Sequence, residues 1–246
     1  EVEVQNAVLI EEKANLKEEL DKEEELLLNM LPRNVAKEII ETGKAAPKKY
    51  RLASVMFADF QNFTKISENL RPVELVKELD DFFAHFDDTV DKYTVEKIKT
   101  SGDAYMCVGG IPDRNMTNPI DAILAGMEFI EYVEEKKKKV EGTDAPLWEL
   151  RVGIHTGKLV AGVIGKKKFL YDVWGDTVNI ASRMEGAGAA GKINISEATY
   201  AHIKQYFDCE YRGKLPVKNK GLVDMYYVNR IKPLYSEDER GWRPNE

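Results

Sequence analysis

Cysteine and histidine are scarce in this chain of 246 residues, which has two cysteines and three histidines. Cys107 and Cys209 stand in apolar or strand-like stretches without the spacing of metal ligands. They therefore indicate buried, reduced thiols and an intracellular compartment, not a disulfide framework. His85, His155 and His202 share no metal-binding spacing either, so we expect each of them in packing or capping.

Long apolar runs and an excess of positive charge are also missing. No stretch approaches the roughly 18 apolar residues that cross a bilayer, and no signal peptide is visible, so the sequence predicts a soluble, cytoplasmic segment without membrane contact. Asp and Glu number 43 against 36 Lys and Arg, for a formal net charge of −7. This balance argues against a surface that binds DNA or RNA. The absence of an initial methionine suggests a piece of a longer protein.

Residues 1–30 are rich in charged, helix-forming residues, and their apolar residues recur in heptads. One heptad position holds Val2, Leu9, Leu16 and Met30, and the other holds Leu20 and Leu27. This seam predicts a short parallel coiled coil, which Asn6, Lys13 and Glu23 interrupt; a single solvated helix is the alternative. With a second helix at 33–41 that ends at Gly43, residues 1–46 are expected to form a signalling helix and linker below an upstream sensor domain.

Beyond residue 50, short apolar strands alternate with amphipathic helices. Strands are expected near 51–59, 93–99, 104–109, 149–155, 158–164, 168–172, 206–212 and 222–229. Helices are expected at 63–93, 119–138, 175–185 and 197–203. The order predicts an α/β (α+β) domain over 47–230 with a ferredoxin-like or polymerase-palm core, in which helices flank a mainly antiparallel sheet. The polar tail 231–246 is expected to be loosely held.

Two acidic residues end apolar stretches that this topology would bring together. Asp59 closes the run from Ser54, and Asp103 follows Gly102 in the turn of the expected hairpin. Paired carboxylates at the edge of a sheet are hard oxygen ligands that suit Mg²⁺ or Mn²⁺. In isolation each would be a strand cap or turn residue, but together they predict a site for two metal ions.

A third segment, Tyr171–Arg183, sets Asp172, Asn179 and Arg183 along the start of one helix. Asn179 and Arg183 are four residues apart and so share a helical face. With the segments around Asp59 and Asp103, this stretch closely resembles the catalytic domain of class III nucleotidyl cyclases, over roughly residues 47–228. The resemblance implies that Asp59, Phe60 and Asp103 belong to the metal site.

The resemblance also assigns the remaining site residues. Lys99 and Asp172 match the positions that bind the base, and a lysine donor with a carboxylate acceptor complements adenine. Asn179 matches the residue that orients the ribose, and Arg183 the residue that stabilises the transition state. Phosphate binding falls to the helix start after Asp59 and to two basic residues: Asn62, Phe63, Thr64, Arg151 and Lys218. Lys220 is a rival for Lys218, and Asn62 stands where the family usually has glycine.

The resemblance implies an adenylate cyclase, a phosphorus–oxygen lyase that converts ATP to cyclic AMP in signal transduction. It also implies a homodimer whose sites are shared: Asp59, Asp103 and Arg151 come from one subunit, and Lys99, Asp172, Asn179, Arg183 and Lys218 from the other. A guanylyl cyclase and a silent nucleotide-binding or dimerisation module remain alternatives. A diguanylate cyclase is a poorer one, because its Gly-Gly-Asp/Glu-Glu-Phe signature is missing.

Overall fold

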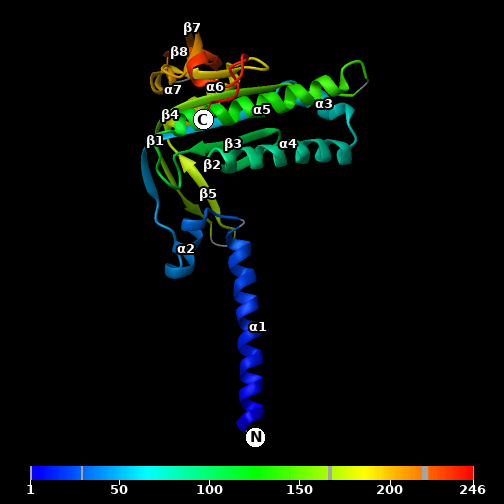
Figure 1. Ribbon diagram of the computed structural model, residues 1–246, viewed down its shortest axis with the longest axis vertical. Helices are drawn as coiled ribbons and strands as arrows, with labels where there is room; N and C mark the ends of the chain where they lie inside the picture. Colours follow the sequence, from blue (N-terminus) through cyan, green and yellow to red (C-terminus); the bar gives the residue numbers. More distant parts are fainter. Residues whose placement is uncertain (1, 29, 144, 166–167, 218–220, 246) are drawn as a thin grey trace. The chain divides into compact units, whose positions relative to one another are not determined.

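The structure is a computed structural model of residues 1–246, and it describes all of them except 1, 29, 144, 166–167, 218–220 and 246 (Figure 1). The helices are α1 (Val2–Leu28), α2 (Arg33–Thr42), α3 (Phe63–Asn69), α4 (Pro72–Lys92), α5 (Asn118–Val140), α6 (Asp176–Gly186) and α7 (Glu197–Ile203), with a short 3₁₀ helix at Pro233–Tyr235. The strands are β1 (Lys48–Phe60), β2 (Val95–Ser101), β3 (Ala104–Gly109), β4 (Leu150–Ile164), β5 (Leu170–Trp174), β6 (Ile193–Ser196), β7 (Phe207–Val217) and β8 (Gly221–Ile231).

The chain divides into two compact units, and the smaller comprises residues 1–47 and 162–172. Its two helices confirm the helical prediction for this region. Gly43 ends α2 in the left-handed conformation and donates its N–H to the carbonyl of Ile39, 2.8 Å away, as a C-terminal glycine cap does. Leu16 and Leu20 on α1 are exposed, and their pairing in a coiled coil stays a prediction. Within the described residues, no helix combines the length and apolarity that a membrane span needs.

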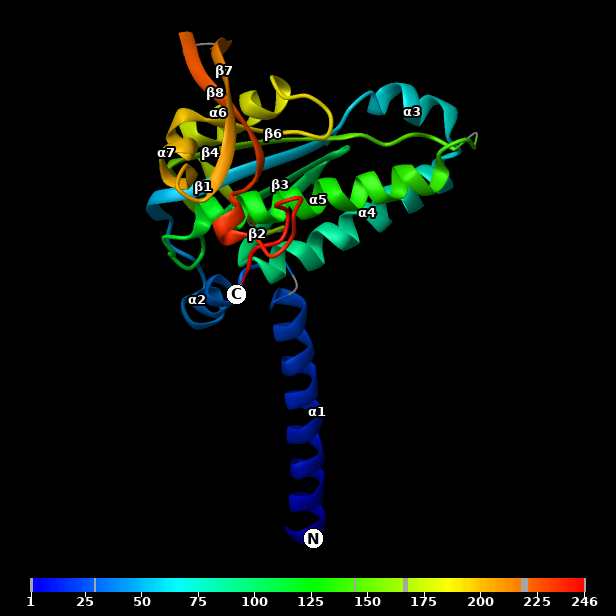
Figure 2. The ribbon, with the colours of Figure 1, turned by 45° about the horizontal axis from the view of Figure 1, so that its top comes forward.

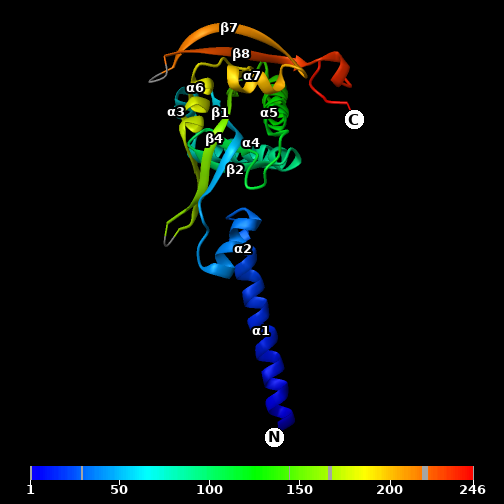
Figure 3. The same cartoon turned by 90° about the vertical axis from the view of Figure 1, so that its left-hand side faces the viewer.

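The sheet has the order β2-β3-β1-β4-β6-β8-β7, with β5 paired to β4. Most of its strands belong to the larger unit, residues 48–161 and 173–246, whereas the end of β4 and most of β5 belong to the smaller one. Every pairing whose register is defined is antiparallel except that of β4 with β6. The order of β1 to β4, with α4 and α5 in the two crossovers, is that of a βαββαβ core. The predicted mainly antiparallel, ferredoxin-like sheet is therefore confirmed. Figure 3 shows β7 and β8 as a pair of long curved strands.

Helices α4 and α5 lie side by side and contact the sheet (Figure 2). Phe82 and Phe86 on α4 are four residues apart, so they share one face of the helix. Both are fully buried: Phe82 packs on Phe60 of β1 at 4.8 Å between ring centroids, and Phe86 stacks on Phe129 of α5 at 4.0 Å. This aromatic cluster fixes the two helices to the strand whose end carries Asp59.

The expected elements differ from the structure most at three places, and the short strand β6 (Ile193–Ser196) was not expected at all. The helix expected over 63–93 is two helices, because Pro72 disfavours helical backbone at Arg71, which is extended with ψ near 145°. The two strands expected over 149–164 are one continuous strand, β4. β2 begins at Val95, two residues later than expected, because Thr94 has a positive φ of 54°.

The tail after β8 is held by specific contacts, contrary to the expectation of a loose segment. Arg240 forms ion pairs with Glu131 and Glu134 on α5. The guanidinium of Arg240 also lies 3.8 Å from the ring centre of Trp242. The ion pairs tie the tail to α5, while the cation–π contact lies within the tail.

Gly153 marks the closest approach between β4 and α6. A Cβ atom on Gly153 would lie 1.8 Å from the backbone nitrogen of Glu185 and 2.5 Å from the carbonyl carbon of Met184. These neighbours are backbone atoms, which no rotamer change can move. The last turn of α6 therefore rests directly on the strand, with no side chain between them.

Replacing Gly153 with alanine should push α6 off β4. We expect Gly153→Ala to lower the free energy of unfolding by about 3 kcal/mol, the upper range for overpacking a rigid core. The matched control is Gly186→Ala in α6, since its Cβ meets nothing within 4 Å and should change stability by no more than about 1 kcal/mol. Urea denaturation of both variants measures the difference, and equal stabilities would contradict the close contact.

Candidate active site

Asp59 and Arg151 lie opposite each other on paired strands. In the antiparallel register of β1 and β4, Asp59 is the Cα partner of Arg151. Side chains of directly opposed residues point to the same face of a sheet. The Nη2 atom of Arg151 donates a hydrogen bond to Oδ1 of Asp59 at 2.9 Å. Strand register alone thus brings together residues that are 92 positions apart.

Asp103 lies in the two-residue turn between β2 and β3. Ser101 and Ala104 are paired, so Gly102 and Asp103 form the turn, and Gly102 takes the positive φ of 63° that such turns require. Burial and then the negative charge of Asp59 raise the pKa of Asp103, while backbone hydrogen bonds from Asp103 and Phe60 oppose the rise. The hairpin therefore brings the second carboxylate to the first, as the sequence predicted.

These oxygen atoms suit a divalent cation. A nearby positive charge would offset the effect of Asp59 that raises the pKa of Asp103. Carboxylate oxygens are also the ligands that Mg²⁺ and Mn²⁺ take. Among the described residues, no group of three or more His, Cys, Asp or Glu side chains is arranged around a common metal position. A metal here would rely on Asp59 and Asp103, with further ligands from substrate or water.

Arg151 contacts a second carboxylate that the sequence analysis missed. Its Nε atom lies 2.5 Å from Oε1 of Glu185 on α6. Burial raises the pKa of Glu185 to about 7, and the nearby Arg151 opposes this rise. Burial lowers the pKa of Arg151, but the two carboxylates raise it more, so the guanidinium stays charged. The sequence did contain a signal for Glu185. It follows two residues after Arg183, in the last turn of a helix, where the helix dipole disfavours an acidic side chain.

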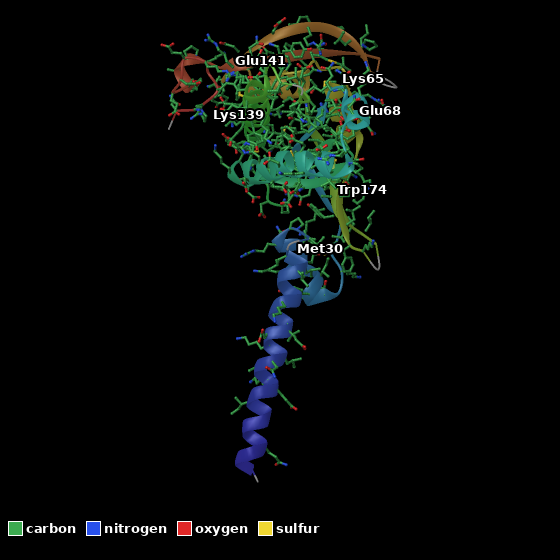
Figure 4. The ribbon with its side chains drawn as sticks, turned by 90° about the vertical axis from the view of Figure 1, so that its right-hand side faces the viewer. Met30, Lys65, Glu68, Lys139, Glu141 and Trp174 are labelled. Carbon is green, nitrogen blue, oxygen red and sulfur yellow. The ribbon has the colours of Figure 1, made fainter. Side chains whose placement is uncertain are left out.

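The helix start after β1 has the backbone expected of it. Asn62 is left-handed, with φ of 61° and ψ of 22°, and caps α3 without a side-chain hydrogen bond. Asparagine thus takes here the conformation that glycine adopts more easily. Phe63 and Thr64 begin the helix, so their N–H groups lack intrahelical partners and are available to phosphate oxygens. Lys65 and Glu68 on α3 are exposed (Figure 4).

The two residues predicted to bind the base lie in different compact units. Lys99 is half-buried on β2, directly after a β-bulge in its pairing with β3. Asp172 is buried on β5, with 7% of its surface exposed. Both make polar contacts with other residues. Their relative placement is not defined by either unit alone.

Asn179 and Arg183 share the exposed face of α6. Ala181 and Met184 on the same helix are buried, so α6 packs by one face and presents the other to solvent. Within the described part of the chain, the side chains of Asn179 and Arg183 make no hydrogen bond or ion pair. Lys218, like its rival Lys220, lies outside the described residues.

A cavity of about 490 Å³ lies elsewhere in the larger unit, between α4, α5 and the C-terminal tail. His85, Tyr132 and Trp242 are among its lining residues. None of the predicted site residues lines it. This cavity is therefore separate from the predicted site.

Residues 45–230 match the family model described as the adenylate and guanylate cyclase catalytic domain. An adenylate cyclase of Mycobacterium tuberculosis is 40% identical over 216 residues, which cover 87% of this chain and 48% of that protein. Human guanylyl cyclase C is 36% identical over 230 residues, or 91% of this chain and 21% of that protein. The chain thus spans about half or less of the curated relatives it matches.

Solved structures agree with these matches. The adenylyl cyclase CyaB from P. aeruginosa superposes with a TM-score of 0.69 at 29% identity, covering 74% of this chain and 95% of that one. The catalytic core of a rhodopsin-guanylyl cyclase with converted specificity, in complex with ATPalphaS, gives a TM-score of 0.68 at 34% identity, with coverages of 74% and 97%.

Replacing Asp103 with asparagine should change the stability of the protein and its metal binding in opposite directions. Because the pKa of Asp103 is raised in the folded state, its ionisation at neutral pH costs stability. We therefore expect Asp103→Asn to raise the unfolding temperature of the metal-free protein by a few degrees. In the parent protein, Mn²⁺ at a hundredfold excess over its Kd should add about 2.7 kcal/mol to the free energy of unfolding. Asp103→Asn should abolish this stabilisation by Mn²⁺. Thermal denaturation with and without Mn²⁺ measures both.

The matched control is Asp80→Asn, because Asp80 is exposed on α4. That variant should leave the response to Mn²⁺ unchanged. An Asp103→Asn protein that Mn²⁺ stabilises as much as the parent would contradict a metal site at this carboxylate.

Proposed function

This chain belongs to the family of class III nucleotidyl cyclase catalytic domains, and we propose that it converts ATP to 3′,5′-cyclic AMP and pyrophosphate. The observation that carries this choice of substrate is the pair Lys99 and Asp172, which match the two positions that bind the base in class III cyclases. A half-buried lysine and a buried aspartate would offer a donor to N1 of adenine and an acceptor to its amino group.

Guanine would leave both groups mismatched. Its N1 is a donor and its O6 an acceptor, the reverse of the adenine edge. A buried donor or acceptor without a partner costs about 1–3 kcal/mol. Two mismatches therefore cost about 2–6 kcal/mol, which corresponds to discrimination of roughly 30-fold to about ten-thousandfold. The 36% identity to human guanylyl cyclase C keeps a guanylyl cyclase as the second candidate.

The carboxylates of Asp59 and Asp103 would hold Mg²⁺ or Mn²⁺, two ions per site, with the backbone carbonyl of Phe60 as a further oxygen beside them. When bound, these ions would make the 3′-hydroxyl more acidic and neutralise charge on the phosphates. The 3′-oxygen would lose its proton and bond to the α-phosphorus, while the bond from that phosphorus to the pyrophosphate oxygen breaks. Holding the ribose and triphosphate in line for this attack is the main task of the protein groups.

The remaining residues would divide this work. The N–H groups of Phe63 and Thr64, with the turn at Asn62, would bind phosphate oxygens, together with Arg151 and Lys218. Asn179 would orient the ribose, and Arg183 would stabilise the charge that grows on the α-phosphate in the transition state.

We propose that two copies of the chain build each site. Asn179 and Arg183 are exposed on α6 and have no side-chain partner among the described residues, whereas Asp59 and Arg151 are bound to each other on the sheet. A symmetric homodimer would bring the helix face of one copy to the carboxylates of the other, twice. Asp59, Asp103 and Arg151 would then come from one subunit and Lys99, Asp172, Asn179, Arg183 and Lys218 from its partner.

The substrate is tested by measuring cyclic nucleotide production from ATP and GTP with Mg²⁺ and with Mn²⁺. We expect cyclic AMP, with a kcat/KM for ATP at least about 30-fold above that for GTP. The double variant Lys99→Glu with Asp172→Cys should reverse or abolish the preference for ATP. The control variant Lys139→Glu, at the exposed end of α5 (Figure 4), should leave the preference unchanged. Cyclic GMP as the main product of the parent chain would establish the second candidate. No product from either nucleotide would favour a silent module.

The shared site is tested by mixing two inactive variants. Asp59→Ala and Arg183→Ala should each lose nearly all activity, because one removes a metal ligand and the other the transition-state cation. Mixed in equal amounts and allowed to exchange, they should regain up to roughly a quarter of parental activity, since half of the dimers would be mixed and each would contain one intact site. A mixture that stays inactive while subunit exchange is demonstrated would contradict the shared site.

A further inference from the structure

Arg151 contacts two different carboxylates through two of its nitrogen atoms, by a hydrogen bond at Nη2 and by an ion pair without hydrogen-bond geometry at Nε. Nη2 donates to Asp59 on β1, and Nε lies against Glu185 on α6. Only 27% of the Arg151 side chain is exposed, with 21% for Asp59 and 13% for Glu185. The guanidinium is a rigid planar fork, so a contact at Nε orients the outer nitrogens as well.

The Glu185 end of this arrangement is built rigidly. Gly153, two residues after Arg151 on β4, lets the backbone of Glu185 approach the strand without a side chain between them. Asn194 on β6 donates from Nδ2 to the carbonyl of the preceding Met184 at 2.7 Å. Glu185 is therefore fixed relative to the strand that carries Arg151.

The Asp59 end has two competing uses. The same carboxylate that accepts the hydrogen bond from Arg151 is the one that would bind a metal ion. A cation at Asp59 would weaken its attraction for the guanidinium. Nη2 would then lose its partner just when a metal-bound triphosphate arrives with oxygen atoms that need one.

We propose, on the basis of the proposed function, that Glu185 is a positioning residue: it holds Arg151 by Nε so that Nη2 can pass from Asp59 to a phosphate oxygen of the substrate without the side chain leaving its place. Arginine loses much rotamer freedom when it is immobilised. With Glu185 in place, Arg151 loses this conformational entropy when the protein folds and not when the substrate binds.

Electrostatics alone predicts the opposite effect of removing Glu185 on anion binding, so the direction of the change in affinity tests the proposal. Asp59, Asp103 and Glu185 are all acidic, so removing any of them should strengthen the binding of a polyanion by simple electrostatics. If Glu185 positions Arg151, its removal weakens that binding instead, although a negative charge has been lost.

The experiment measures binding of inorganic tripolyphosphate by calorimetry, with no metal ion and no turnover, in the full chain. Asp59→Asn removes the negative charge that holds Nη2 and leaves only a weaker, neutral acceptor, so it should tighten binding about tenfold relative to the parent. Asp103→Asn removes an equal charge without a contact to Arg151, and should tighten binding less. Adding Glu185→Ala to Asp59→Asn should reverse the gain, whereas adding Glu185→Gln, which keeps an oxygen near Nε, should retain most of it.

Equal or tighter binding after Glu185→Ala in the Asp59→Asn background would overturn the proposal. If the alanine variant does not fold, as judged by thermal denaturation, the comparison of Glu185→Gln with Glu185→Leu at similar volume decides in the same way. In activity assays, Glu185→Ala should raise KM for the nucleotide about tenfold and change kcat less, since β- and γ-phosphate contacts persist from ground state to transition state.

The two proposals fail separately. Loss of tripolyphosphate binding in the alanine variant, with no cyclic product from the parent chain, would leave the role of Glu185 standing and remove the proposed reaction. Cyclic AMP from the parent chain, with unchanged or tighter tripolyphosphate binding in the alanine variant, would do the reverse.

Discussion

The site depends on the antiparallel pairing of β1 with both of its neighbours. Pairing with β4 sets Asp59 opposite Arg151, and pairing with β3 brings the turn that contains Asp103 to the same end of the strand. A shift of one residue in either register would send these side chains to opposite faces of the sheet. The aromatic packing of Phe60 against Phe82 opposes such a shift, because a slipped strand would remove a fully buried ring from the core.

Much of this arrangement could be predicted from the sequence, because the signals were local. The alternation of strands and helices predicted the sheet, and the glycine turn before Asp103 predicted the hairpin that brings it to Asp59. Glu185 was missed because its role comes from a contact across 34 positions, which no local period encodes. The break before Pro72 was missed although the rule for the residue before proline predicts it; the apolar spacing on both sides of the break resembled one long helix.

The electrostatics of the site follow from a shortage of positive charge. Two carboxylates, Asp59 and Glu185, contact one guanidinium, and the negative charge of Asp59 also acts on a third carboxylate, Asp103. Burial raises the pKa of both Asp103 and Glu185. A core built for stability alone would not collect such groups. Under the proposed function, divalent cations that bind with the nucleotide would supply the missing positive charge, and Arg151 would be the cation beside Asp59 until they bind.

Gly153 places this chemistry under a constraint in evolutionary terms. It carries no functional group, yet any side chain there would separate α6 from β4 and move Glu185 away from Arg151. Even the smallest step, to alanine, meets backbone atoms, so no gradual series of side chains leads away from glycine. Selection for the ion pair would therefore fall as strongly on a residue without chemistry as on the two charged residues, and an inventory of functional groups would overlook it.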